Sequence, residues 1–113
     1  MKKIEAFIKP FQLQTVKQAL LDQGITGMTI MEVQGFGTQA GHHETVNGTE
    51  YRVDFLPKVL IILVIEDHLE DTVVNLILDQ CCTGHIGDGK ILVTSIEKAI
   101  RIRTREEGVK AIR

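Results

Sequence analysis

The chain has 113 residues, enough for one modest core, and its 43% hydrophobic and 25% charged residues are an ordinary soluble composition. We therefore expect residues 1–113 to form a single domain. A net charge of -2 and an aromatic content of 4% argue against a nucleic-acid-binding protein, because such a protein needs a basic surface and, for single strands, stacking rings.

The N-terminal part of the chain predicts a strand, a helix and a second strand. Apolar residues alternate over residues 2–9, as in a strand, and Pro10 ends the alternation. From residue 11 to residue 23 the spacing becomes helical, and Gly24 is a typical helix stop. Residues 29–35 have the pattern of the second strand.

The rest of the chain repeats this order. Residues 59–65 are continuously apolar, which predicts a strand covered on both faces and is far too short to cross a bilayer. A helical stripe follows, and residues 91–96 predict the last strand; the stripe consists of Leu69, Val73, Leu76 and Ile77. The pattern D-Q-x-x-T-G also recurs, at 22–27 and 79–84. Two equivalent halves predict an α+β fold, the ferredoxin-like double βαβ sandwich with a long loop between the halves.

The N-terminus and the cysteines predict a cytoplasmic protein. The segment M-K-K-I-E-A-F-I-K-P carries a charge inside its apolar run and does not resemble a signal peptide. With no membrane insertion expected, the chain belongs in a compartment that keeps thiols reduced. Cys81 and Cys82 are adjacent, without the C-x-x-C spacing of zinc or redox motifs, and are predicted to be buried small hydrophobic residues.

Residues 37–55 form a long segment with three glycines and no sustained apolar period. Such a connection within a domain is either a functional arm or a floppy insertion. Residues such as Tyr51 and Phe55 near its far end could dock on a partner. His42 and His43 could bind a metal, but neighbouring histidines do not share a face of a regular element and solvated loop histidines are common, so we predict no metal site.

Residues 83–90, T-G-H-I-G-D-G-K, form a glycine-rich loop that satisfies G-x-x-x-x-G-K. Ile91 stands where a P-loop needs Ser or Thr for magnesium, and the loop follows a helix and precedes a strand, the reverse of a P-loop. Glycines can still turn successive N–H groups toward an anion beside Lys90. The alternative is a plain helix-to-strand turn with a lysine on its rim.

Ile100-Arg101-Ile102-Arg103 is a second basic element. In an extended segment both guanidinium groups leave one face and could bind a polyphosphate in bidentate fashion; the alternative is a solvated edge. The loop and the arginine pair together favour an anion site. No aspartate, glutamate or histidine stands out as a base aimed at a phosphoryl group, which favours binding over an ATPase or phosphotransferase, although weak ATP hydrolysis fits the same residues.

Stretches spread over almost the whole chain match one known family. They are M-K-K-I-E-A-F-I-K-P-F at the start, G-I-T-G-M-T (24–29), E-V-Q-G-F-G (32–37), G-T-E-Y-R-V-D-F-L-P-K (48–58), T-G-H-I-G-D-G-K-I and I-R-I-R-T. With this combination the chain resembles the PII signal-transduction proteins of nitrogen regulation.

The resemblance implies a homotrimer that binds ATP or ADP in clefts between subunits, with Mg²⁺ beside ATP and 2-oxoglutarate as a further ligand. One subunit would supply Gly35, Phe36, Gly37, Thr38, Gly87, Asp88, Gly89 and Lys90, and its neighbour Met28, Thr29, Arg101 and Arg103. Gln39 matches the residue that helps hold Mg²⁺, and Lys58 the residue that pairs with 2-oxoglutarate. Residues 37–55 resemble the T-loop, which reports the bound ligand to ammonium transporters and nitrogen-assimilation enzymes. Tyr51 matches a tyrosine that some bacteria uridylylate.

The sequence departs from the family pattern at several positions. Thr38 stands where an arginine near the phosphates is usual, and Arg105 replaces a frequent glycine. Leu60 and Ile62 stand where a lysine and a glutamate are common. Three T-loop residues replace ones that are usually basic or aromatic: Ala40, Val46 and Asn47. These departures keep open an alternative, a divergent regulator that senses ADP or AMP with another small ligand or a metal and serves a different transport process.

Overall fold

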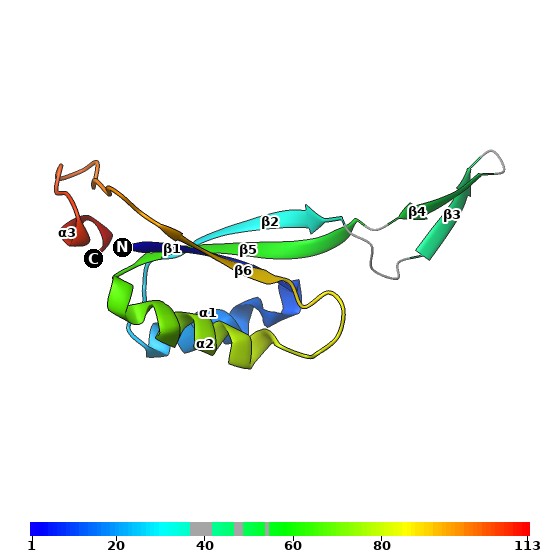
Figure 1. Cartoon of the computed structure of the whole chain (residues 1–113), viewed down its shortest axis with the longest axis horizontal. Helices are drawn as coiled ribbons and strands as arrows, with labels where there is room; N and C mark the ends of the chain where they lie inside the picture. Colours follow the sequence, from blue (N-terminus) through cyan, green and yellow to red (C-terminus); the bar gives the residue numbers. More distant parts are fainter. Residues whose placement is uncertain (37–41, 47–48, 54) are drawn as a thin grey trace.

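The structure, a computed structural model, describes residues 1–36, 42–46, 49–53 and 55–113. Its main sheet consists of β1 (Lys2–Ile8), β2 (Thr29–Gly35), β5 (Leu56–Ile65) and β6 (Lys90–Ser95), and its two long helices are α1 (Leu13–Asp22) and α2 (Glu70–Cys81). The strands are antiparallel in the order β2-β5-β1-β6, and both helices lie on the same face of the sheet (Figure 1). This arrangement confirms the predicted α+β, ferredoxin-like fold.

The core lies between the sheet and the two helices. Alternate residues of β1 point toward the helices, and Ile4, Ala6 and Ile8 are at most 1% exposed. The predicted stripes meet them there, because Val16 of α1 and Val73 of α2 are fully buried. Burial of each such large aliphatic side chain stabilises the fold by about 1.5–3 kcal/mol. The helical periods of the sequence therefore identified the core correctly.

The ends of α1 follow the local sequence. The chain leaves β1 through a short 3₁₀ turn, Pro10–Gln12, where proline suits the first turn because it has no N–H to satisfy. At the other end Gly24 has φ 80° and its N–H donates to the Leu21 carbonyl (2.9 Å), while Ile25 N–H donates to Leu20 (3.0 Å). This bonding pattern ends a helix where a glycine takes the left-handed conformation, so the predicted stop is confirmed.

Within the described residues, no helix covers the other face of the sheet (Figure 1). β5 was predicted to be covered on both faces, and that prediction is wrong for the single chain, since its residues Ile62 and Val64 are only half-buried. The same open face carries Met31 of β2 and Leu92 of β6, which are 45% and 47% exposed. The sheet thus presents an apolar surface that a single chain leaves uncovered.

The segment 37–55 is less irregular than its sequence indicated. It contains a hairpin of β3 (His42–Val46) and β4 (Thr49–Val53), which pair antiparallel as a separate two-stranded sheet beyond the ends of β2 and β5 (Figure 1). The missed signal is Asn47-Gly48, the dipeptide preferred in two-residue hairpin connections. β5 also begins three residues earlier than predicted, at Leu56.

The segment after β6 forms a turn instead of the expected extended pair of arginines. Ile100 bridges to Glu107, residues 102–104 turn, and Arg105 N–H donates to the Arg101 carbonyl (2.7 Å). Arg105 has φ 63°, the conformation that favours glycine. Two short helices complete the chain, the 3₁₀ turn Asp67–Leu69 before α2 and α3 (Val109–Ile112). Within the described ranges, none of the helices has the length and hydropathy needed to span a membrane.

Candidate functional site

The glycine-rich loop connects the end of α2 to the start of β6, as predicted, and Lys90 is the first residue of that strand. Three of its glycines have positive φ: Gly84 (79°), Gly87 (102°) and Gly89 (96°). Side chains rarely adopt these angles, which explains the density of glycines. The N–H groups of Ile86, Gly87 and Asp88 donate to no acceptor in the described part of the chain. The loop therefore offers unpaired amide donors next to a lysine.

Gly89 is fixed by its contact with β1. A Cβ built on Gly89 would lie 1.7 Å from the Phe7 carbonyl oxygen and 2.9 Å from the Phe7 carbonyl carbon. No side chain fits there unless the backbone moves. Since Phe7 also pairs with Lys90 across the β1–β6 ladder, this close approach seats the end of the glycine loop on the sheet.

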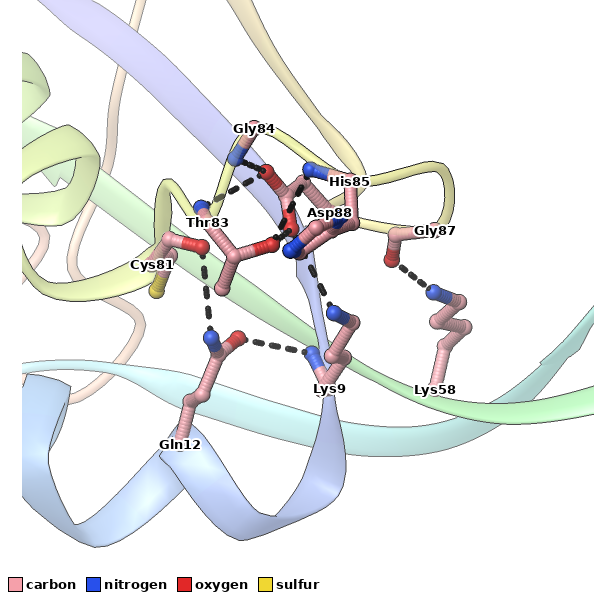
Figure 2. Close-up of polar contacts among 9 residues, drawn as sticks. All are labelled: Lys9, Gln12, Lys58, Cys81, Thr83, Gly84, His85, Gly87 and Asp88. Carbon is pink, nitrogen blue, oxygen red and sulfur yellow. Dashed lines mark hydrogen bonds and ion pairs between the residues drawn. The ribbon is translucent and has the colours of Figure 1, made fainter.

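Asp88 lies at the centre of a hydrogen-bond network inside the loop (Figure 2). Its Oδ2 accepts hydrogen bonds from the N–H groups of Thr83 (2.8 Å) and Gly84 (2.9 Å). Its Oδ1 accepts from the Thr83 hydroxyl and from Lys9 Nζ at 3.3 Å. The Thr83 oxygen in turn accepts from the His85 N–H (3.2 Å). One carboxylate thus connects the first residues of the loop to the end of β1.

The same donors hold the pKa of Asp88 well below its ordinary value of 3.8, the Thr83 hydroxyl most strongly, then the Thr83 and Gly84 amides and Lys9. A depressed folded-state pKa means that the network stabilises the protein above the unfolded-state pKa of about 3.9. That contribution is lost only as the pH falls through the lower, folded-state value. Asp88 is therefore ionised throughout the physiological range.

Lys58 reaches the same loop from β5. It is 8% exposed, and its Nζ donates to the Gly87 carbonyl (Figure 2). Burial lowers the pKa of Lys58, and the positive charge of Lys9 lowers it further, while Asp88 opposes both effects. A Cβ built on Gly35 of β2 would lie 3.4 Å from the Lys58 Cγ, so a larger residue there would crowd the lysine. One chain thus brings together Gly35, Lys58 and residues 87–90.

Gln12 connects the start of the first helix to the end of the second. It is 6% exposed; its Nε2 donates to the Cys81 carbonyl (3.2 Å) and its Oε1 accepts from the Lys9 N–H (3.2 Å). This bridge fixes the end of α2, where the glycine loop begins, relative to Lys9 (Figure 2). Cys81 is buried as predicted, but Cys82 is exposed because α2 ends before it.

Replacing Gln12 with alanine is expected to lower the free energy of unfolding by about 1–3 kcal/mol, because it leaves the buried Cys81 carbonyl and the partly buried Lys9 amide without this partner. Urea denaturation measures the loss. The matched control is Gln18→Ala, which removes an exposed bond to Asp22 (2.9 Å) and should change stability by less than about 0.5 kcal/mol. Equal effects of the two substitutions would contradict the structural role of the bridge.

The neighbour-subunit residues implied by the resemblance do not reach the loop of their own chain. Met28 and Thr29 lie at the start of β2, on the opposite edge of the sheet from β6, so about three strand spacings, or roughly 14 Å, separate them from Lys90. Arg101 and Arg103 follow the far end of β6. The strand alone places them roughly 17 Å or more from Lys90.

Arg101 already has partners in its own segment. Its guanidinium lies 3.4 Å from the Glu106 carboxylate and donates to the Arg113 carbonyl, whereas Arg103 is exposed on the turn. Arg103 is therefore more accessible to a ligand than Arg101. The alternating sequence did not indicate this difference.

The base of segment 37–55 is marked by an aromatic pair. Phe36 and Phe55 are both exposed, and their ring centroids lie 5.2 Å apart. Phe55 packs beside Phe36 at the base of the segment and stays exposed, so its docking on a partner remains a prediction. Gly37, Thr38 and Gln39 lie outside the described residues. Tyr51 is described only as a residue of β4, opposite Glu44.

Three residues of the site were not identified from the sequence: Lys9, Gln12 and Thr83. Lys9 and Asp88 are 79 positions apart, so no local pattern relates them. Thr83 could have been found, because a threonine at the start of a turn and an aspartate near its end are residues that commonly bond to nearby backbone N–H groups.

Comparison with known proteins places the chain in one family. The family model described as "Nitrogen regulatory protein P-II" matches residues 1–106. The chain is 57% identical to the "Nitrogen regulatory protein P-II" of Haemophilus influenzae over 112 residues, which cover 99% of this chain and 100% of the relative. With the same coverage it is 56% identical to the "Nitrogen regulatory protein P-II 1" of Escherichia coli and 55% identical to the P-II protein of Pasteurella multocida. All three relatives are named as regulatory proteins, not as enzymes. The chain belongs to the P-II family of nitrogen regulatory proteins.

Proposed function

We propose that this chain is a non-enzymatic signalling protein that binds ATP or ADP between the subunits of a homotrimer. The observation that carries the proposal is the glycine loop, where the N–H groups of Ile86, Gly87 and Asp88 have no acceptor among the described residues and Lys90 follows in the sequence. Backbone amides next to a lysine suit a polyphosphate, because they supply donors and positive charge without a base that would drive its hydrolysis.

The separation of the basic residues supports a site shared between subunits. Lys90 and the Arg101–Arg103 turn lie at opposite ends of β6, so they can act on one phosphate chain only if they come from different copies. The uncovered apolar face of the sheet supports assembly as well, since Met31, Ile62 and Leu92 would be buried against other copies. A closed ring of three copies would repeat the same junction three times.

The proposed signal leaves the site through segment 37–55. The hairpin lies in the sequence between β2 and β5, and Phe36 and Phe55 pair beside the ends of these strands, next to Gly35 and Lys58. A ligand at Lys58 would therefore act on the strands that carry the hairpin. We propose 2-oxoglutarate for that place, Mg²⁺ with ATP near Gln39, and an ammonium transporter or nitrogen-assimilation enzyme as the target. Tyr51 of β4 is the proposed modification site.

Calorimetric titration with ATP, ADP and AMP, each with and without Mg²⁺ and 2-oxoglutarate, tests the proposal. We expect ATP and ADP to bind at one site per chain, and 2-oxoglutarate to bind only when Mg²⁺ and ATP are present. Binding of ADP or AMP without any effect of 2-oxoglutarate would favour the divergent sensor. Turnover of ATP at about 1 per second or faster would contradict a purely signalling role.

A further inference from the structure

We infer that the Asp88 side chain is a positioning residue, which shapes the glycine loop from inside and touches neither nucleotide nor Mg²⁺. This inference deepens the proposed function and rests on it. It specifies how Asp88 would contribute to the phosphate site implied by the resemblance, through its backbone and not through its carboxylate. Its backbone N–H, which has no acceptor in the described part of the chain, remains available to a ligand.

The Asp88 carboxylate has no acceptor site left for a ligand. An ionised carboxylate has about four places at which it can accept a hydrogen bond. All four are filled by the protein itself, two on Oδ2 by the amides of Thr83 and Gly84 and two on Oδ1 by the Thr83 hydroxyl and Lys9. A metal ion or a ligand donor would have to displace one of these groups. The Asp88 carboxylate therefore bonds to the protein and not to a ligand.

The loop amides fall into two groups, those bonded within the network and those left without an acceptor among the described residues. Asp88 occupies the N–H groups of Thr83 and Gly84, and the Thr83 hydroxyl that Asp88 holds accepts the N–H of His85. The next three N–H groups, of Ile86, Gly87 and Asp88, are left free within the described ranges. The network thus satisfies the N–H groups at the start of the loop. It also fixes the backbone conformation that orients the N–H groups without an acceptor.

The charges around the loop also favour an internal role for the Asp88 carboxylate. A carboxylate beside a polyphosphate would repel it, and Lys9 is the cation that offsets this charge, at 3.3 Å on the β1 side of the network. Lys58, the other cation beside the loop, bonds to the Gly87 carbonyl and not to Asp88. Asp88 and Lys9 therefore form a neutral internal pair, and the charges left for a phosphate are those of Lys58 and Lys90.

The test uses three matched substitutions in the full chain: Asp88→Asn removes the charge at constant size, Thr83→Val removes the hydroxyl at constant shape, and Thr83→Ser keeps the hydroxyl. Two quantities are measured. One is hydrogen–deuterium exchange of residues 82–89 without nucleotide. The other is ATP affinity, with Mg²⁺ and with EDTA. Circular dichroism melting confirms that each variant is folded.

We expect Asp88→Asn and Thr83→Val to speed exchange of the loop by about 10-fold or more and to weaken ATP binding by about 10-fold, by the same factor with and without Mg²⁺. Thr83→Ser should behave like the original chain in both measurements, which a general loss of packing would not reproduce.

Three results would overturn the inference. A loss of affinity confined to the Mg²⁺ titration would make Asp88 a metal ligand. Tighter ATP binding in Asp88→Asn with unchanged exchange would mean that the carboxylate faces the phosphates. Unchanged exchange in both Asp88→Asn and Thr83→Val would show that the network does not hold the loop. If instead the original chain binds no nucleotide, the proposed function fails, and the exchange experiment still decides whether Asp88 orders the loop.

Discussion

Replacing Gly89 with alanine is expected to lower the free energy of unfolding by about 3 kcal/mol or more, at or above the upper end of the usual range for a single substitution. The new Cβ would lie 1.7 Å from the Phe7 carbonyl oxygen, and φ at this position is 96°. The clash is with backbone, so no side-chain rotation can relieve it. Either β1 and β6 separate at the Phe7–Lys90 pair or the loop changes its path. Thermal and urea unfolding of the variant measure the cost.

Gly84→Ala is the matched control for this experiment. Gly84 has a similar φ of 79°, but nothing lies within 4 Å of the position that a Cβ would take there. Alanine at this position introduces only the strain of the left-handed conformation, about 1–2 kcal/mol. The difference between the two variants isolates the steric contact with β1. If both variants lose the same stability, Gly89 does not approach Phe7 as closely as the structure places it.

The second large effect concerns nucleotide affinity. Lys90→Ala and Arg103→Ala are each expected to weaken ATP binding by about 10- to 100-fold, the usual range for removal of a charge-assisted hydrogen bond. Because the two residues lie at opposite ends of β6, we expect them to serve the same site from different subunits. Mixing equal amounts of the two variants, unfolding and refolding them together, should then restore original affinity at about one site in four, as random assembly predicts.

A reversed mixture provides the control. The double variant Lys90→Ala with Arg103→Ala is refolded with the original chain in equal amounts. Sites shared between subunits again give about one intact site in four, whereas sites contained in one chain give about one in two. Sites contained in one chain also predict no restoration in the first mixture. Calorimetric stoichiometry distinguishes these outcomes, and original affinity in the Arg103→Ala variant alone would remove Arg103 from the site.

The features that could be predicted from the sequence are those that depend on residues close together along the chain. The stripes of α1 and α2, the stop at Gly24 and the helix–loop–strand order around Gly84 all follow from residues within a few positions of one another. The same holds for the glycine loop as a source of free amides. Local propensity and periodicity are physical properties of short segments, so they can be predicted without the fold.

Other features depend on residues that are distant in sequence. Lys9 meets Asp88 only because β1 and the glycine loop lie side by side, and Gln12 reaches Cys81 across the two helices. The uncovered face of β5 was misjudged for a related reason. The apolar residues of β5 predict that both faces of the strand are buried. The pattern does not show whether the second face is buried by the same chain or by another copy. The turn at 101–105 was missed because alternation of isoleucine and arginine fits an extended segment equally well.

The open apolar face of the sheet also bears on what stability means for this protein. Each square ångström of such surface that meets another copy contributes about 25 cal/mol, and it contributes only after the encounter. In the proposed trimer, the free energy of unfolding of each chain would then depend on its contacts with the other copies. If the chain assembles as proposed, we expect its melting temperature to rise with protein concentration, so that each melting temperature is to be compared at a stated concentration.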